Sequence, residues 1–375
     1  FADQASIDGF ATAHPGCTTI VGEVTITGNG ITDLDGLSTI TAMPAGLSLL
    51  NCGALPDITG LDAMTSVGYL NINNCDQLVD LSGLGSITTI DGFLLVQNNA
   101  VLEDLNGLGA VSSVEDFVAI RSNAALQDMS GLDALQSIGG YLQISENPTL
   151  ATLSGLGALG QVGEYMSVTS CTLLADISNL GTLADVGTFV QVSNLPQLTS
   201  LDGLQQIDPA PLSSYSAFGC PQLSACAVAS LCGFIDLGGS PTINGNASGC
   251  ASIPEVTAAC ATVTIDEVAS QPFAVEIDPT TGWVSVHSTR PGYIKVFDAT
   301  GRQLLQQRLT GQTTRIDPHH LNNAISIIQV SQLDGTVIFN VSPANANTLH
   351  LNWQTRYADQ FVVPQTRGIV RDSVS

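Results

Sequence analysis

The chain is poor in positive charge, in aromatic residues and in histidine. Its 375 residues include 9 Lys and Arg against 33 Asp and Glu, and Phe, Trp and Tyr together make up 5%. A surface with the resulting net charge of −24 argues against nucleic acid or anionic lipid as a partner. No run of about 18 apolar residues is present, so the sequence predicts no membrane span.

The groups that most enzymes use for catalysis are also few. The five histidines are His14, His287, His319, His320 and His350, and none lies in the long segment between the first two. A nucleophile in that segment therefore has no histidine base beside it. The sequence also lacks an H-E-x-x-H metal motif, a phosphate-binding loop and a nucleophile elbow. We expect a protein that is not an enzyme and that carries no metal or other cofactor.

Charge divides the chain into two parts. Residues 1–260 contain 24 acidic residues and a single basic one, Arg121, whereas residues 261–375 contain 9 acidic and 8 basic residues. The net charge thus changes from −23 to −1 near residue 260. We interpret so abrupt a change as a domain boundary.

Residues 1–219 contain a repeat of 23 or 24 residues, of which LQDMSGLDALQSIGGYLQISEN (residues 126–147) is one unit. A unit of this length that repeats without interruption indicates a solenoid of stacked coils. The dipeptide Gly-Leu, replaced once by Asn-Leu, marks the units at Gly36, Gly60, Gly83, Gly107, Gly131, Gly155, Asn179 and Gly203.

A short strand follows the second glycine of the unit, because apolar and polar residues alternate there. Parallel strands about 4.8 Å apart make nine coils a rod on the order of 40 Å long. We therefore predict an all-β-dominated fold in which a leucine-rich β-solenoid of about nine coils is the main element. The inward-facing pairs are Leu70 and Ile72, Leu94 and Val96, Val118 and Ile120, Leu142 and Ile144, Met166 and Val168, and Val190 and Val192.

A column of Asn and Cys residues follows these strands. We interpret it as structural, because such side chains hydrogen-bond the backbone of the turn that they enter. Cys52 and Cys75 fall on adjacent coils, where they either form a disulfide or stay free and buried. The column consists of Asn29, Cys52, Cys75, Asn99, Asn123, Asn147, Cys171, Leu195 and Cys220.

A second column carries carboxylates, which stacking brings roughly 5 Å apart. Unpaired, they repel by about 1 kcal/mol per neighbour, so each needs a compensating interaction. Our first interpretation is that each accepts N–H bonds from its own turn, as Thr and Ser in the same column also can. The alternative is a row of calcium sites. The column consists of Asp33, Asp57, Asp80, Asp104, Asp128 and Asp176, with Thr152 and Ser200.

Nine cysteines, five of them between residues 220 and 260, indicate an extracellular or outer cell-surface location. A metal site is the alternative, but no CxxC pair supports it.

The last coil of a solenoid exposes its apolar cross-section unless a cap covers it, and we expect residues 220–260 to form a cap held by disulfides. Four cysteines allow three pairings, which stay open; Cys17 is a candidate for the same role at the other end. The four candidates are Cys226, Cys232, Cys250 and Cys260.

The start IDGFATAHPGCTTIVGEVTITG (residues 7–28), the repeats and the closing cysteine pattern occur in this order. Together they resemble bacterial surface proteins whose repeats are similar to the receptor L domain. The resemblance covers residues 1–260 and implies a right-handed solenoid with capped ends. It does not imply one particular ligand.

After residue 260 the repeat disappears. Short β-rich segments alternate with turn sequences such as PTTG, RPG and LDG, which predicts a small β-sandwich over residues 261–343. We predict no structure for the tail, residues 344–375. The β-rich segments are residues 262–266, 273–278, 283–288, 293–298, 302–309, 324–331 and 336–342.

Residues 277–286, 293–305 and 313–330 are similar to the C-terminal sorting domain of the type IX secretion system of Bacteroidetes, in a degenerate form. The resemblance implies a carrier domain that the type IX machinery takes across the outer membrane. Such a domain is usually removed when its cargo is anchored or released. The matching motif residues are Pro279, Thr280, Thr281, Gly282, Asp298, Gly301 and Arg302.

The outward positions of the predicted strands are mostly small and uncharged. Such a face can bind a glycan, or it is simply a solvated sheet; the regular Thr column that ice binding needs is missing. We expect a non-catalytic binding or adhesion module whose partner is an extracellular glycan or protein. The alternative is a structural surface spacer without a specific ligand. The candidate binding residues are Asn71, Asn73, Arg121, Gln143, Ser145, Ser167, Thr169 and Gln191.

Overall fold

The chain folds into two compact units, Phe1–Val263 and Thr264–Ser375. The computed structural model describes residues 1–262 and, beyond them, the strand segments between residues 273 and 367 that are given below. The first unit is a β-solenoid, and the strands of the second form two antiparallel sheets.

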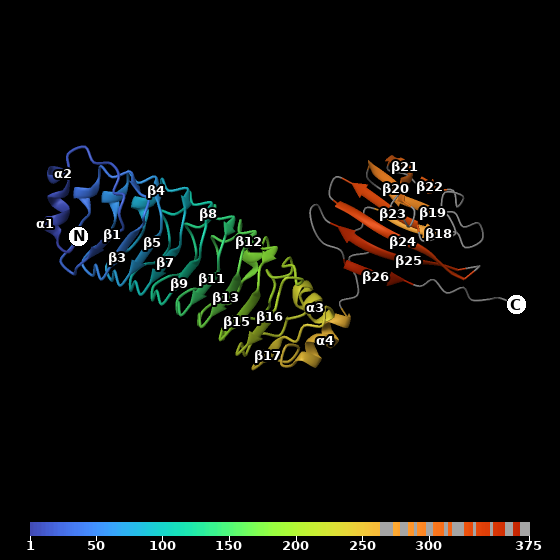
Figure 1. Cartoon of the computed structure of the whole chain (residues 1–375). Helices are drawn as coiled ribbons and strands as arrows, with labels where there is room; N and C mark the ends of the chain where they lie inside the picture. Colours follow the sequence, from blue (N-terminus) through green and yellow to red (C-terminus); the bar gives the residue numbers. More distant parts are fainter. Residues whose placement is uncertain are drawn as a thin grey trace. The chain divides into compact units, whose positions relative to one another are not determined.

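The first unit is built around a sheet of ten parallel strands, one per coil, stacked along the solenoid (Figure 1). Each strand pairs in register with the strand of the next coil, so that Leu142 lies opposite Met166 and Ile144 opposite Val168. The constant repeat length produces this register, because equal coils bring equivalent residues side by side. In sheet order the strands are β1 (Val24–Thr27), β3 (Leu47–Leu50), β5 (Leu70–Asn73), β7 (Leu94–Gln97), β9 (Val118–Arg121), β11 (Leu142–Ser145), β13 (Tyr165–Thr169), β15 (Phe189–Ser193), β16 (Ser214–Phe218) and β17 (Thr242–Asn244).

A second parallel sheet, made of two-residue strands, lies on the opposite side of the coils (Figure 1). Its strands are β2 (Ala42–Met43), β4 (Ser66–Val67), β6 (Thr89–Ile90), β8 (Ser113–Val114), β10 (Ser137–Ile138), β12 (Gln161–Val162) and β14 (Asp185–Val186). Four of the turns between the two sheets are 3-10 helices, which are η1 (Asp35–Leu37), η2 (Thr59–Leu61), η3 (Ser82–Leu84) and η4 (Ser178–Leu180).

The core is a continuous aliphatic column inside the coils. All the inward-facing residues that the alternation predicts are at most 1% exposed, which confirms the period of two. Leucines of the turns, such as Leu126, Leu132 and Leu135, complete each coil and are buried to the same degree. Burial of one such side chain stabilises the fold by about 1.5–3 kcal/mol relative to its exposure.

Two short helices, α1 (Gln4–Asp8) and α2 (Phe10–Ala13), cover the N-terminal end of the solenoid (Figure 1). Phe1 also extends the edge of β1, because its ammonium donates to the carbonyl of Thr25 at 2.6 Å and its carbonyl accepts from the amide of Thr27 at 2.9 Å. The thiol of Cys17 is free. The idea that Cys17 staples this end is therefore wrong, because helices close the first coil without a disulfide.

The C-terminal end is covered by α3 (Ala229–Asp236) and α4 (Ile253–Thr262) (Figure 1). Two disulfides, Cys226–Cys250 and Cys232–Cys260, select one of the three pairings that the sequence left open. β17 lies between these helices in sequence, so the long sheet continues into the segment that the cysteine pattern assigned to the cap.

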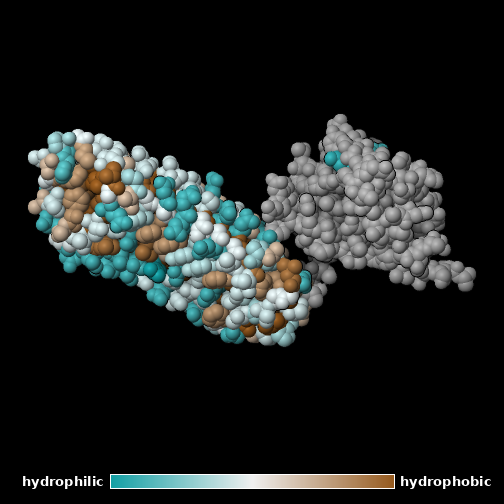
Figure 2. All heavy atoms as spheres, in the orientation of Figure 1, coloured by the Kyte–Doolittle hydropathy of each residue, from teal (hydrophilic) through white to brown (hydrophobic). Residues whose placement is uncertain are grey.

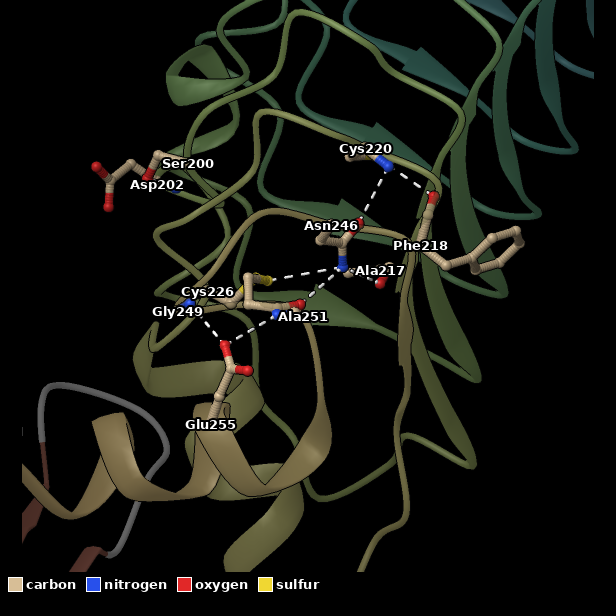
Figure 3. The surroundings of a disulfide bond; sticks show 11 residues. Ser200, Asp202, Ala217, Phe218, Cys220, Cys226, Asn246, Gly249, Ala251 and Glu255 are labelled. Atoms are coloured by element: carbon tan, nitrogen blue, oxygen red, sulfur yellow. Dashed lines mark hydrogen bonds between the residues drawn. A yellow bond between two sulfur atoms is a disulfide. The ribbon is translucent and has the colours of Figure 1, made fainter.

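Hydrogen bonds fix the cap to the last coils. The carboxylate of Glu255 accepts from the amides of Gly249, at 2.7 Å, and Ala251, at 3.3 Å (Figure 3). Inside, the hydroxyl of the fully buried Tyr215 lies 3.3 Å from that of Ser230, and burial raises the pKa of Tyr215. The phenol therefore stays neutral and acts as part of the packing.

The second unit consists of antiparallel strands in two sheets. One sheet contains β18 (Phe273–Ile277), β19 (Val284–Ser288) and β22 (Thr314–Ile316). The other contains, in sheet order, β21 (Gln303–Thr310), β20 (Pro291–Phe297), β23 (Ser326–Gln332), β24 (Gly335–Asn345), β25 (Thr348–Arg356) and β26 (Val363–Arg367). Strands thus occur at six of the seven predicted β-rich segments. The other segment, residues 262–266, begins at Thr262, which is the last residue of α4. β25 and β26 lie in the tail for which the sequence predicted no structure.

Candidate functional site

The carboxylate column is structural. Each side-chain oxygen of the column accepts a hydrogen bond of 2.8–3.2 Å from the backbone N–H two residues further on. This confirms the first interpretation, in which each turn satisfies its own side chain. Among the residues that the structure describes, no group of three or more His, Cys, Asp or Glu side chains is arranged to hold a metal ion. The residues concerned are Asp33, Asp57, Asp80, Asp104, Asp128, Asp176, Thr152 and Ser200.

The asparagine column joins neighbouring coils. Asn99, Asn123 and Asn147 are fully buried, and each side-chain oxygen accepts the backbone N–H of the column residue one coil earlier at 2.9–3.1 Å. Each side-chain amide donates to a strand carbonyl of the preceding coil at 2.9–3.2 Å. The column therefore binds backbone as predicted, but it binds the preceding coil and not the turn that it enters. Asn29, in the first coil, is exposed instead.

Asn246 continues this column, which the sequence analysis missed. Its oxygen accepts from the amide of Cys220 at 3.0 Å, and its amide donates to the carbonyl of Ala217 at 2.8 Å (Figure 3). Asn246 follows Cys220 by 26 residues, and this departure from the period hides it. The only signal in the sequence is the segment INGN, which begins at Ile243.

The cysteines of the column are free thiols, so Cys52 and Cys75 do not form a disulfide. Their thiols donate to strand carbonyls of the preceding coil, Cys52 to Ile26 at 3.4 Å and Cys75 to Leu49 at 3.8 Å. Burial raises the pKa of Cys171 to about 11. A neutral thiol is a poor nucleophile and a poor metal ligand, so Cys171 serves the fold. The pKa of Cys52 is instead lowered, chiefly by its hydrogen bond with Cys75.

Six aromatic rings stack in one column on the outward face of the long sheet. Successive ring centroids are 4.5–4.8 Å apart and the rings are within 10° of parallel. The rings are partly exposed. This aromatic ladder consists of Tyr69, Phe93, Phe117, Tyr141, Tyr165 and Phe189.

The sequence analysis missed the aromatic ladder. Its signal was present, since an aromatic residue recurs every 24 residues immediately before the alternating pair of each coil. Aromatic residues make up only 5% of the chain, and their recurrence at this position was not recognised. Only the stacked structure reveals that these residues contact one another.

The stacking decides which part of each ring meets solvent. Ring faces are occupied by the neighbouring rings, so the ladder presents ring edges and tyrosine hydroxyls. At one end, the Tyr69 ring occupies the space where a side chain at Gly46 would lie. Burial raises the pKa of Tyr141 and of Tyr165, so both phenols are neutral hydrogen-bonding groups. Ring edges carry partial positive charge and favour contact with oxygen atoms.

The predicted binding residues occupy two rows beside the aromatic ladder. In strand register, Asn71, Gln143, Ser167 and Gln191 share the first row with Ser48, Leu95 and Ala119. Asn73, Arg121, Ser145 and Thr169 share the second row with Leu50, Gln97 and Ser193. We call the aromatic ladder and these two rows together the outward face.

Two of the predicted binding residues are not exposed. Ser145 is 7% and Ser167 8% exposed, so their inclusion in an exposed face is wrong. Their side chains are short, and their neighbours in the same rows include the longer Gln143 and Arg121. The other six predicted residues are partly exposed.

Several polar side chains of the outward face lack partners inside the protein. Arg121 Nε donates to Gln97 Oε1 at 2.7 Å. Within the described part of the chain, however, the side chains of Gln143 and Thr169 make no hydrogen bond, and Asn71 Oδ1 is buried without a donor. The partly exposed side chains of Gln143 and Thr169 therefore offer free donors and acceptors to an oxygen-rich ligand.

The seven predicted sorting-motif residues lie outside the described residues. Among the described helices, none is long and apolar enough to cross a membrane. Comparisons with protein-family models, with curated proteins and with solved structures found no match to the chain. Function is therefore argued from the chain's own geometry.

Proposed function

We propose that the solenoid is a non-catalytic binding or adhesion module that holds an extended glycan or protein along its outward face. One observation carries the proposal: an aromatic ladder runs beside two rows of polar side chains, several of which have no partner inside the protein. The partly exposed donors and acceptors of these rows can bond a ligand in place of water.

The repetition of the face favours a ligand that is itself a polymer. Equivalent positions recur about every 4.8 Å from strand to strand, so one extended ligand chain can contact many coils, although the side chains differ from coil to coil. On the side of the first unit seen in Figure 2, hydrophobic residues form separate patches among hydrophilic ones. Hydrophobic residues scattered in this way are normal on a protein surface and do not by themselves mark a binding site.

An extracellular or outer cell-surface location belongs to this proposal. Two disulfides in the cap support it, because disulfides persist in oxidising compartments. The similarity of residues 277–330 to type IX sorting domains supports delivery by that bacterial secretion machinery, with the second unit as carrier. An intact-mass measurement on culture fluid tests delivery: secretion of the solenoid only when residues 264–375 are present is the expected result.

A structural surface spacer is the second candidate. The observation that favours it is the chain of asparagine bonds linking coil to coil, which stiffens the rod whatever its face contacts. A spacer needs no particular residue on the outward face. Binding measurements with face variants therefore separate the two candidates.

A glycan array probed with the full chain is the test. We expect saturable binding that is lost when Asn71, Asn73, Gln143 and Gln191 are all replaced by Ala. The matched control replaces Gln136 and Gln161, exposed on the other side of the coils, and should bind like the parent chain. Equal binding by both variants, or binding to no glycan or purified extracellular protein, would favour the spacer.

A further inference from the structure

Arg121 stands out by its place and its rarity. It is the single basic residue among residues 1–260, which contain 24 acidic residues. It ends β9, the fifth of the ten strands of the long sheet, and it is partly exposed. The unit's only Lys or Arg side chain therefore lies near the middle of the outward face.

The guanidinium of Arg121 is oriented but not neutralised. Gln97 accepts its Nε–H at 2.7 Å, which leaves the terminal nitrogens with four N–H donors. Among the described residues, no carboxylate lies within ion-pair distance of it. Glu146, on the turn that follows β11, accepts instead from the hydroxyl of Ser122 at 2.9 Å. A cation placed merely to relieve acidic repulsion would be expected to pair with one of the many carboxylates.

We propose that Arg121 anchors a single carboxylate or sulfate group of an otherwise neutral polysaccharide that lies along the outward face. The planar fork of a guanidinium matches such an anion with two parallel hydrogen bonds. This inference rests on the proposed binding function and specifies the chemistry of its ligand.

The surroundings of Arg121 suit a sugar chain. In its own row it is flanked by Gln97 and Ser145. Burial raises the pKa of Tyr141 and of Tyr165, and the charge of Arg121 acts in the opposite direction on both phenols. Hydroxyl and amide groups thus lie beside the cation, and nearby carboxylates also act on these phenols. One isolated anionic group can pair with Arg121, whereas a polyanion would be repelled by the unit's 24 acidic residues.

An array of paired polysaccharides tests the inference with the full chain. Neutral glycans that carry one uronic acid are printed beside their carboxyl-reduced forms, and glycans that carry one sulfate group beside their desulfated forms. We expect at least tenfold tighter binding to the acidic member of one pair, and this comparison identifies which anion is recognised. Arg121→Gln should remove that preference, whereas Arg121→Lys should retain part of it because the charge is kept.

The outcomes separate the inference from the proposed function. Equal binding to acidic and neutral members, or an unchanged preference in a folded Arg121→Gln variant, overturns the inference and leaves glycan binding standing. Binding to no polysaccharide of either kind also overturns the inference, and it leaves a protein as the partner under the proposed function. A thermal melt followed by circular dichroism shows that the variant is folded, and Gln161→Ala serves as the matched surface control.

Discussion

Two sets of polar side chains in the same coils are used in opposite ways. Asn123, inside the solenoid, bonds the backbone amide of Asn99 and the carbonyl of Val96 in the neighbouring coils. Asn71, on the outward face, has a buried oxygen without any donor among the described residues. The buried asparagines of the inner column use both donor and acceptor between coils, whereas Gln143 on the face has no side-chain partner among the described residues.

The two sets also differ in regularity. The inner column holds Asn or Cys in all but one of nine successive coils, because stacking imposes one geometry on each. The first polar row of the face changes from Ser48 to Asn71, Leu95 and Ala119 in four successive coils. Outward side chains can vary because they need not fit the geometry of the next coil. A face that varies along its length can bind one ligand at one fixed position.

The largest effect is expected where coils approach most closely. Gly107 has φ of +112°, and a Cβ there would overlap the carbonyl of Leu81. Gly107→Ala should destabilise the solenoid by roughly 3 kcal/mol or more in urea unfolding. Gly109→Ala, in the same turn, is the control, since a Cβ at Gly109 meets nothing within 4 Å. Equal losses of stability in the Gly107→Ala and Gly109→Ala variants would show that neighbouring coils can move apart at little cost in free energy.

The second effect concerns the inner column. Asn123→Ala removes the acceptor of the Asn99 amide and the donor to Val96, and should cost about 2–3 kcal/mol in the same measurement. Asn123→Cys should cost less, because Cys75 already uses its thiol to bond the equivalent carbonyl, that of Leu49. If Ala is tolerated as well as Cys, the column contributes packing rather than hydrogen bonds.

The aromatic ladder should show an intermediate effect. Phe117 stacks on Phe93 and Tyr141, with centroids 4.8 and 4.6 Å apart. Phe117→Ala should cost about 2 kcal/mol, since each stacked pair contributes about 0.5–1.5 kcal/mol. Phe189, at the end of the ladder, stacks on one ring only, so Phe189→Ala should cost about half as much. Thermal melts compare the two variants, and a larger loss at Phe189 would contradict the ladder as a stabilising stack.

A gain in stability is expected at Glu146. Its φ of +58° lies in the left-handed region, where four of the equivalent positions hold Asn. Glu146→Asn should raise the free energy of unfolding by about 0.5–1 kcal/mol, because Asn adopts this conformation more easily. The reverse change, Asn98→Glu, should lower it by a similar amount. A loss of stability in Glu146→Asn would mean that its bond to Ser122 outweighs the backbone preference.

The smallest effect on stability is expected on the outward face itself. Gln143 makes no side-chain hydrogen bond among the described residues, so Gln143→Ala should change the unfolding free energy by less than about 0.5 kcal/mol. The difference in unfolding free energy between Gln143→Ala and Asn123→Ala compares the outward face with the inner column directly. A large loss at Gln143 would place the face among the structural parts of the protein.

Much of the interior could be predicted from sequence. The inward pairs, such as Leu142 and Ile144, and the carboxylates, such as Asp128, lie where the repeat put them, because each depends on geometry within one coil or between equal coils. The outward face was predicted less well. Ser145 and Ser167 are buried, and the aromatic ladder exists only through contacts between residues 24 positions apart.

The sequence by itself determined the solenoid, its register, its hydrophobic column and its acidic turns, since a constant repeat length repeats one local geometry. Only the tertiary structure decided the pairing of the cap cysteines, the helices that close both ends, the place of Asn246 and the ring edges that meet solvent. The physical reason is the same in each case. At the ends and on the outer surface no next coil enforces the period, so contacts between distant residues select the arrangement.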